Sequence, residues 1–326
     1  MKRLTLFALI LGFAVGCNNQ QAKKSNTEVQ KPEKIRIAYQ LGHVPCIVAK
    51  HKKLFEEEFK NDNIEIEVRK FEFGPPLVEA ISAGQLDVGT LGDQPAIIGW
   101  AKGVDYRIVG NSNGGNTKMA ILLPENSKVQ SFAELKGKKI AIAVGSNNLH
   151  FLHILLKKAG FTLNDIKLVN LKFPDSILAL SLNQVDATIV SEPYITLATF
   201  KHKARILTYS GGYKYITLPI LASGNFIRNY PEYVVRILKV YRKANQWARE
   251  NPEEATDILL KEENNLLPRE VDRNLIDKYT ANFGLSDTAV AAFRQTFEFL
   301  KEDKLISTDL NIDSIYTFKF EKEAFK

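Results

Sequence analysis

The chain has 326 residues, enough for one large or two ordinary domains, and its 45% hydrophobic and 25% charged residues are typical of a globular protein with a sizeable core. Its net charge of +7 comes from 44 basic and 37 acidic residues that are scattered without a basic block, which argues against nucleic-acid binding. Only two cysteines occur, Cys17 and Cys46, and because Cys17 lies in a targeting segment no disulfide within the domain is expected.

The amino terminus has the pattern of an export signal. Lys2 and Arg3 precede an apolar run over residues 4–15, which is too short to cross a bilayer. Ala-Val-Gly then leads to Cys17, a pattern that resembles the lipobox of bacterial lipoproteins and implies cleavage before Cys17 and lipidation of its thiol. A plain secretory signal that happens to contain a cysteine is the alternative. We therefore expect residues 1–17 to be a lipoprotein signal peptide ending at the lipidated cysteine.

Residues 18–33 are polar and lack aromatic side chains, so they cannot bury enough apolar surface to fold. We expect this segment to be a flexible tether between the anchor and the folded domain.

Strand-like and helix-like segments alternate after the tether, which predicts an α/β fold. In the first series we expect strands over residues 34–39, 64–68, 88–91, 106–110 and 119–123, and helices over residues 47–59 and 76–83. Asn111, Ser112 and Asn113 are turn-forming residues and predict a polar loop after the fourth strand.

A similar series follows residue 124. Ser131 and Glu134 have capping-box spacing before a short helix, and Ser146 can cap a helix whose apolar face carries leucines at helical spacing. We expect strands over residues 138–144, 166–170, 187–190 and 206–209, and a helix over residues 175–182.

The two series predict two lobes. A strand-like segment over residues 215–223 returns the chain to the first lobe, so two crossings, near Leu123 and Thr217, would form a hinge around a ligand cleft. We expect the first lobe to comprise residues 34–123 and 217–326, including helices at the carboxyl end, and the second to comprise residues 124–216. Residues 229–250 place Val234, Ile237, Leu238 and Tyr241 on one face, as expected for a helix packed on a lobe.

Several motifs, in this order and spacing, carry a family resemblance. They are FEFGPPLVEA at 71–80, GQLDVG at 84–89, GDQPA at 92–96, LKGKKIA at 135–141, GSN at 145–147, and VDA at 185–187 followed by EPY at 192–194. From residue 34 to about residue 325 the chain resembles the solute-binding proteins of the alkanesulfonate, taurine and nitrate ABC importers. The resemblance implies a two-lobed periplasmic-binding-protein-like (type II) fold with two hinge crossings. It also implies an extracytoplasmic monomer that binds a small molecule between its lobes and delivers it to an ABC permease, without a cofactor.

The same resemblance places the ligand where loops leave strand ends and helices begin. The candidate ligand-binding residues are Gln40, Gly42, His43, Phe73, Gly92, Asp93, Gln94, Ser112, Ser146, Asn147, Glu192, Tyr194 and Tyr213. Helix starts near Gln94 and Ser146 offer unpaired N–H groups, which suit a sulfonate, sulfate or nitrate oxygen without an arginine. The predicted loops indeed contain no Arg or Lys.

Each candidate also has a purely structural interpretation. Ser146 and Asp93 could serve only as helix caps, Glu192 could form a salt bridge, His43 could be incidental, and the aromatic residues could belong to the core. If Asp93 and Glu192 both face the cleft, they disfavour a bare anion and favour a ligand that also carries an amine, such as taurine.

Three other functions stay open. The scaffold also suits a thiamine-pyrimidine precursor or another small N-heterocycle. A pyrimidine synthase of thiamine biosynthesis resembles this family but has a cysteine-rich motif, whereas the folded part here has only Cys46, so we expect no enzyme. A surface interaction lipoprotein is the third.

His150 and His153 share a helix, but no third residue has convincing metal-ligand spacing.

Overall fold

The computed structural model describes residues 31–115, 119–307 and 309–326. The expected signal peptide over residues 1–17, the lipidation site Cys17 and the tether as far as residue 30 lie outside the described residues and stay predictions. Within those described ranges, no helix is both long and apolar enough to span a bilayer. Residues 31–326 form one compact unit.

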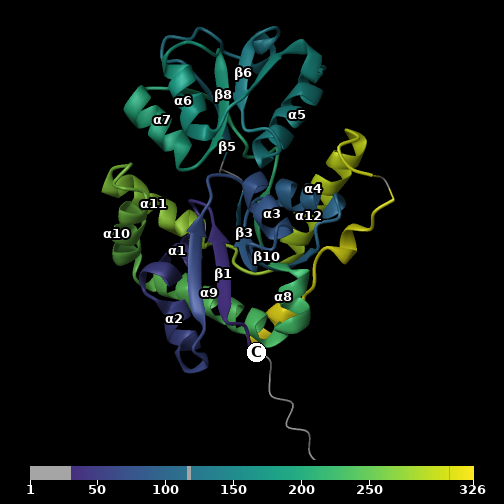
Figure 1. Ribbon diagram of the computed structural model, residues 1–326. Helices are drawn as coiled ribbons and strands as arrows, with labels where there is room; N and C mark the ends of the chain where they lie inside the picture. Colours follow the sequence, from purple (N-terminus) through teal and green to yellow (C-terminus); the bar gives the residue numbers. More distant parts are fainter. Residues whose placement is uncertain (1–30, 116–118, 308) are drawn as a thin grey trace, which may run out of the picture. The chain divides into compact units, whose positions relative to one another are not determined.

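The elements follow one another as the alternating pattern predicts (Figure 1). The first series is β1 (Lys34–Tyr39), α1 (Val44–His51), α2 (Leu54–Phe59), η1 (Lys60–Asp62), β2 (Glu65–Lys70), α3 (Gly74–Ser82), β3 (Val88–Thr90), α4 (Asp93–Ala101) and β4 (Tyr106–Gly115). The second series is β5 (Met119–Leu123), η2 (Phe132–Leu135), β6 (Lys139–Ile142), α5 (Asn147–Ala159), η3 (Leu163–Asp165), β7 (Lys167–Asn170), α6 (Phe173–Ser181), β8 (Ala187–Ser191), α7 (Tyr194–His202) and β9 (Arg205–Tyr209). The last part is β10 (Ile216–Ser223), α8 (Gly224–Asn229), α9 (Pro231–Glu250), α10 (Pro252–Glu262), α11 (Arg269–Thr280), α12 (Asp287–Glu302), η4 (Ile312–Ser314) and α13 (Lys319–Ala324).

Two five-stranded sheets share one pattern. The first has the order β2-β1-β3-β10-β4 and the second the order β7-β6-β8-β5-β9. In each sheet four strands run in one direction, and one strand, β10 in the first sheet and β5 in the second, pairs antiparallel with both of its neighbours. In the second sheet, α6 and α7 lie on one face and α5 on the other (Figure 1). Helices on the sheet faces leave the carboxyl ends of the parallel strands open for a site.

Strand β5 changes the predicted boundary between the lobes. The sequence placed residues 119–123 at the end of the first lobe, but β5 is hydrogen-bonded to β8 and β9 of the second sheet. The apolar character of this strand could not show which sheet it joins. The chain therefore leaves the first sheet after β4 and returns between β9 and β10, and the division into two hinged lobes stays a prediction with its boundary moved to residue 119.

Two local predictions were wrong. A single helix was expected over residues 47–59, but Lys53 adopts a left-handed conformation (φ 54°) that ends α1 and lets α2 begin at Leu54. A loop was expected at Asn111, Ser112 and Asn113, but these residues belong to β4 and pair with β10. Strand pairing there overrides their turn propensity.

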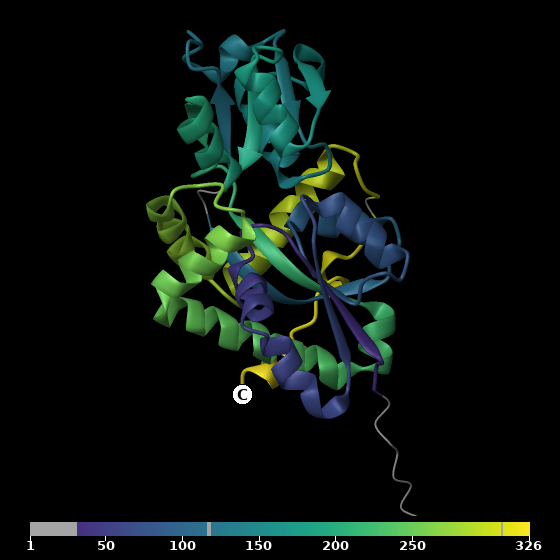
Figure 2. The ribbon, with the colours of Figure 1, turned by 60° about the vertical axis from the view of Figure 1, so that its left-hand side comes forward.

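The carboxyl-terminal helices cover elements of the first sheet. Helix α9 packs against α1, α2 and α13 (Figure 2). Its buried face includes Val234, Ile237, Leu238 and Tyr241, which confirms the face predicted from their spacing. Helix α12 packs against α4.

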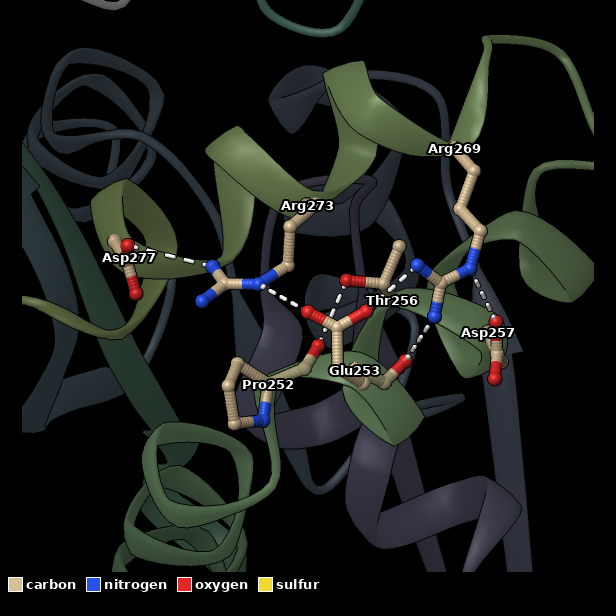
Figure 3. A network of polar contacts seen from close by, with 7 residues as sticks. All are labelled: Pro252, Glu253, Thr256, Asp257, Arg269, Arg273 and Asp277. Atoms are coloured by element: carbon tan, nitrogen blue, oxygen red, sulfur yellow. Dashed lines mark hydrogen bonds and ion pairs between the residues drawn. The ribbon is translucent and has the colours of Figure 1, made fainter.

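A polar network holds α11 against α10 (Figure 3). The two oxygens of the Glu253 carboxylate accept hydrogen bonds from Arg269 at 2.6 Å and from Arg273 at 3.0 Å, and Asp257 accepts a second bond from Arg269 at 3.1 Å. These charges are exposed and screened by salt, so we expect them to orient α11 more than to stabilise the fold. The orientation is relevant because α11 brings Tyr279 to the candidate site.

Candidate functional site

A cavity of about 100 Å³ lies where parallel strands of both sheets end and the following helices begin. Predicted ligand residues that line it are Gln40, Gly42, His43, Phe73, Gly92, Ser146, Asn147, Glu192 and Tyr194. They come from the starts of α1, α3, α4, α5 and α7. This is where open α/β sheets bind ligands, because the helix starts present N–H groups beyond the strand ends.

Larger hollows elsewhere are weaker candidates for a ligand site, and the two largest show why. One, of about 640 Å³, is lined by residues at the opposite edge of the second sheet, where β6 begins and α6 ends. The other, of about 800 Å³, is lined by residues of α5 and α12. Neither lies where helices begin at strand ends, so neither combines N–H groups with side chains of several loops.

Most helix starts around the cavity are already satisfied by side chains. With its amide oxygen turned toward α3, Gln40 accepts from the N–H groups of Phe73 at 3.1 Å and Gly74 at 3.0 Å. The Gln94 N–H at the start of α4 lies 2.9 Å from Asp93 Oδ1 and 3.0 Å from Asn147 Oδ1. At the start of α5, Ser146 O accepts from the Leu149 N–H and Gln94 Oε1 accepts from the His150 N–H at 3.2 Å, so the N–H groups of Asn147 and Asn148 are the candidates for binding an oxyanion.

The loop before α5 is held in a fixed geometry. The Ser146 hydroxyl donates to the Ala143 carbonyl at 2.6 Å and so cannot donate to a ligand at the same time. Asn148 is anchored to β8, because its Nδ2 donates to Ile189 O and its Oδ1 accepts from Ser191. These bonds orient the first turn of α5 toward the cavity.

Gly92 permits a close contact between segments of the two sheets. A Cβ atom at Gly92 would lie 2.7 Å from the amide of Asn147, so only glycine fits at this position. Asn147 uses its Oδ1 for the Gln94 N–H, which leaves its Nδ2 hydrogens as donors for a ligand.

Two glutamates form the acidic side of the cavity. Glu192 was predicted from the sequence, whereas Glu72 was missed. Glu192 accepts hydrogen bonds from Thr196 N at 3.2 Å and Thr196 Oγ1 at 2.9 Å. Burial raises the pKa of Glu192, and the bonds from Thr196 oppose that shift. Glu72 is half exposed and forms an ion pair with Lys172 at 3.7 Å.

Aromatic rings form another part of the wall. Phe73 and Tyr194 were predicted, whereas Phe173 and Tyr279 were missed. The rings of Phe173 and Tyr194 are 5.4 Å apart and inclined at 54°. Phe173 follows a strand and precedes a proline, which is the same kind of strand-end position that identified Phe73. Tyr279 lies on a helix far along the chain, and no local sequence pattern marks it. A Cβ at Gly42 would lie 3.2 Å from the Tyr279 ring, and Gly42 has a positive φ of 86°, so this position favours glycine.

Four predicted ligand residues do not line the cavity. Asp93 and Gln94 belong to a buried network with Lys214, which the sequence interpretation also missed. Ser112 is fully buried in β4, because the predicted loop is a strand. Tyr213 packs against Phe151, with ring centroids 5.9 Å apart, and lines the hollow between α5 and α12 instead.

Cys46, His150 and His153 each have a structural role in the described part of the chain. Burial raises the pKa of Cys46 to about 12, so its thiol is not poised as a nucleophile. His150 accepts a hydrogen bond from Lys214, and His153 pairs with Asp303. Among the residues that the structure describes, no group of three or more metal-ligating side chains is arranged to hold an ion.

Comparisons with known proteins agree with this architecture. A family model described as NMT1/THI5 like matches residues 40–255. The chain is 32% identical to a putative aliphatic sulfonates-binding protein of Bacillus subtilis (strain 168), over 100% of this chain and 97% of that protein. It is 27% identical to a taurine-binding periplasmic protein of Escherichia coli (strain K12), over 71% of this chain and 70% of that protein. The crystal structure of the periplasmic aliphatic sulphonate binding protein SsuA from Escherichia coli is similar with a TM-score of 0.71 and 26% identity, over 87% of this chain and 92% of that one. The predicted fold class is therefore confirmed.

Proposed function

The chain belongs to the NMT1/THI5-like family, and on that premise we propose that it is an extracytoplasmic solute-binding lipoprotein of an ABC importer. The observation that supports this most is the cavity itself, where helix starts from both sheets meet around one small volume. The cavity has a volume of about 100 Å³, which is consistent with a small ligand.

We propose an amino-sulfonate, with taurine as the reference compound, as the ligand class. The oxyanion end would accept hydrogen bonds from the start of α5 and from Asn147 Nδ2. The amine would face Glu192 and Glu72, and the short alkyl part would pack against Phe73 and Tyr194. No Arg or Lys lines this cavity among the described residues, so a bare anion would meet the Glu192 carboxylate without a cation beside it in the cavity.

A thiamine-pyrimidine precursor or another small N-heterocycle is the alternative. The rings of Phe173 and Tyr194 could stack against a heterocycle, and Glu192 could accept its N–H groups. The presence of helix-start donors and carboxylates in one cavity favours the amino-sulfonate.

A calorimetric titration panel tests the ligand class with taurine, ethanesulfonate, nitrate and a methyl-aminopyrimidine. We expect the strongest binding for taurine. Binding of the pyrimidine alone would replace the ligand class and leave the transport role standing, whereas no binding by any compound would count against the cavity as the ligand site.

The proposal also includes a lipid anchor for the protein and a membrane permease as its partner. Lipidation at Cys17 would hold the protein at the membrane surface, near the permease that receives the ligand. We expect a monomer. Co-purification of the lipidated protein with a membrane permease, in the presence of ligand, tests this partnership.

A further inference from the structure

A buried lysine lies behind the cavity, in the segment that returns the chain from β9 to β10. The Lys214 side chain is 1% exposed, and its ammonium group donates to Asp93 Oδ2 at 3.0 Å, to His150 Nδ1 at 2.9 Å and to Thr296 Oγ1 at 2.8 Å. An ammonium group has three donors, so all three are used. Its acceptors lie on α4, α5 and α12, which makes Lys214 the junction of helices associated with both sheets.

The protonation states are consistent with this geometry. Lys214 donates to Nδ1 of His150, so that nitrogen carries no proton, and burial with the nearby Lys214 charge lowers the pKa of His150 to about 2. The His150 ring stacks on Phe299 of α12, with centroids 3.8 Å apart and planes at 7°. The hydroxyl of Thr296 accepts from Lys214 and donates to Asp93 at 2.7 Å. The network therefore has one preferred arrangement.

The network reaches the cavity through two residues. Asp93 uses its other oxygen to accept from the Gln94 N–H, which also lies 3.0 Å from Asn147 Oδ1. The Gln94 side-chain oxygen accepts from the His150 N–H at 3.2 Å. Asn147 lines the cavity, whereas Asp93, Gln94 and Lys214 do not.

We propose that Lys214 is a positioning residue for the ligand site, which holds the starts of α4 and α5 at the separation that orients Asn147 toward the ligand. It acts through Asp93 and Gln94 and does not touch the ligand. The proposal rests on the proposed function in one respect, since it takes the cavity as the ligand site. Separating α4 from α5 would break either the Lys214–His150 hydrogen bond or the Lys214–Asp93 ion pair, and each leaves a buried group without its partner, so this edge resists opening.

Two variants separate positioning from simple charge neutralisation. Lys214→Met keeps the length of the side chain but removes the cation that pairs with the buried Asp93, which destabilises the protein as a whole. The double variant Asp93→Asn with Lys214→Met leaves no buried charge and keeps an acceptor for the Gln94 N–H. Lys157→Met, on the exposed side of α5, is the matched control.

Amide hydrogen exchange of the ligand-free protein is the test, because it needs no ligand. We expect exchange at Gln94 and His150 to rise about tenfold or more in the single and double variants, with strands of both sheets changed less than about twofold. Wild-type protection in the double variant would show that Lys214 only neutralises Asp93 and would overturn the proposal. If Lys214→Met does not fold, the double variant alone decides.

Taurine titration of the same variants separates this proposal from the ligand assignment. We expect the taurine dissociation rate to rise about tenfold in the double variant while the association rate changes little. If wild type does not bind taurine, the ligand class is wrong and the exchange result still decides the role of Lys214. If taurine binds wild type and the double variant with equal rates, the positioning role is rejected.

Discussion

Asn147, the first residue of α5, accepts a hydrogen bond through its side-chain Oδ1 from the backbone N–H of Gln94, near the start of α4, across 3.0 Å. The two residues are 53 positions apart and belong to helices associated with different sheets. This bond gives the Gln94 N–H, near the start of α4, a second acceptor beside Asp93 Oδ1, and it leaves the Asn147 Nδ2 hydrogens as donors. One amide side chain thus links the two helix starts and remains a donor for a ligand.

The first prediction concerns this amide. Asn147→Asp keeps the oxygen that accepts from Gln94 but replaces the donor with a second, negatively charged oxygen. Losing one hydrogen bond to a charged ligand group costs about 1.5–3 kcal/mol, or roughly ten- to a hundredfold in affinity, and repulsion adds to this. Calorimetry with taurine should show a loss of at least this size. Asn126→Asp, an exposed change outside the cavity, should bind like wild type; equal losses in both variants would remove Asn147 from the site.

The second prediction identifies the role of the acidic wall. Glu192→Gln keeps an oxygen that can accept from Thr196 but removes the charge. If the ligand amine faces Glu192, taurine affinity should fall about tenfold or more, whereas ethanesulfonate, which lacks the amine, should bind equally well or better. Glu125→Gln, an exposed loop change, is the control. Equal losses of affinity for both ligands would mean that Glu192 stabilises the loop and does not bind the amine.

The third prediction follows from the raised pKa of Glu192 in the ligand-free protein. Burial raises this pKa above its ordinary value of 4.5, while Thr196 and, through its charge, Lys278 lower it. A raised folded-state pKa contributes stability that is present below the unfolded pKa and lost as pH rises through the folded pKa. The difference between the melting temperatures of wild type and Glu192→Gln should therefore change with pH. It should favour wild type most below pH 4.5 and become less favourable as the pH rises toward neutral.

Glu134 provides a control of opposite sign for this measurement. Hydrogen bonds from Ser131 and Gln130 lower its pKa below 4.5. The stability that it contributes is present above its unfolded pKa and lost as pH falls through the folded pKa. The melting temperature of wild type, measured against that of Glu134→Gln, should thus decrease as the pH is lowered. The same pH trend for both variants would contradict the assignment to Glu192.

Local patterns in the sequence were enough to predict residues that the structure brings together around one cavity. A polar or glycine residue after a buried strand, followed by a helix start, marked Gln40, Gly92, Ser146 and Asn147, and the structure places all four around one cavity. Such patterns are local, and parallel strands with helical crossovers bring their carboxyl ends to a common edge. The same rule, applied to residue 173, would have added Phe173.

The direction of a polar side chain could not be predicted in this way. Asp93 and Asn147 occupy equivalent positions after strands, yet only Asn147 lines the cavity. Asp93 instead pairs with Lys214, 121 positions later, and nothing near either residue indicates that pairing. Tyr279 reaches the site from α11 by tertiary packing and carries no local signal. The side-chain partners that determine the electrostatics of the site depend on long-range contacts.

The fourth prediction concerns how the cavity opens. If the α4–α5 edge is held by Lys214, ligand release should separate α7 from α11 while α5 stays close to α12. Spin labels at Lys201 and Lys278 report the first separation, and labels at Lys157 and Glu302 report the second. Distance distributions without and with taurine should differ by several ångströms for the first pair and little for the second. A larger change in the second pair would place the pivot elsewhere.

The last prediction concerns the amino terminus. A positively charged start, a short apolar run and small residues directly before Cys17 predict lipidation of that thiol. Cys17→Ser cannot form the thioether, so the variant should lose lipid labelling and either leave the membrane fraction or accumulate with its signal uncleaved. Cys46→Ala removes the other thiol and is the matched control; because Cys46 is buried, this variant should keep its lipid and its membrane association. Fractionation with metabolic labelling by a radioactive fatty acid measures both properties. Persistent labelling of Cys17→Ser would show that the membrane anchor, if any, lies at another residue, and the tether over residues 18–33 would then need a different role.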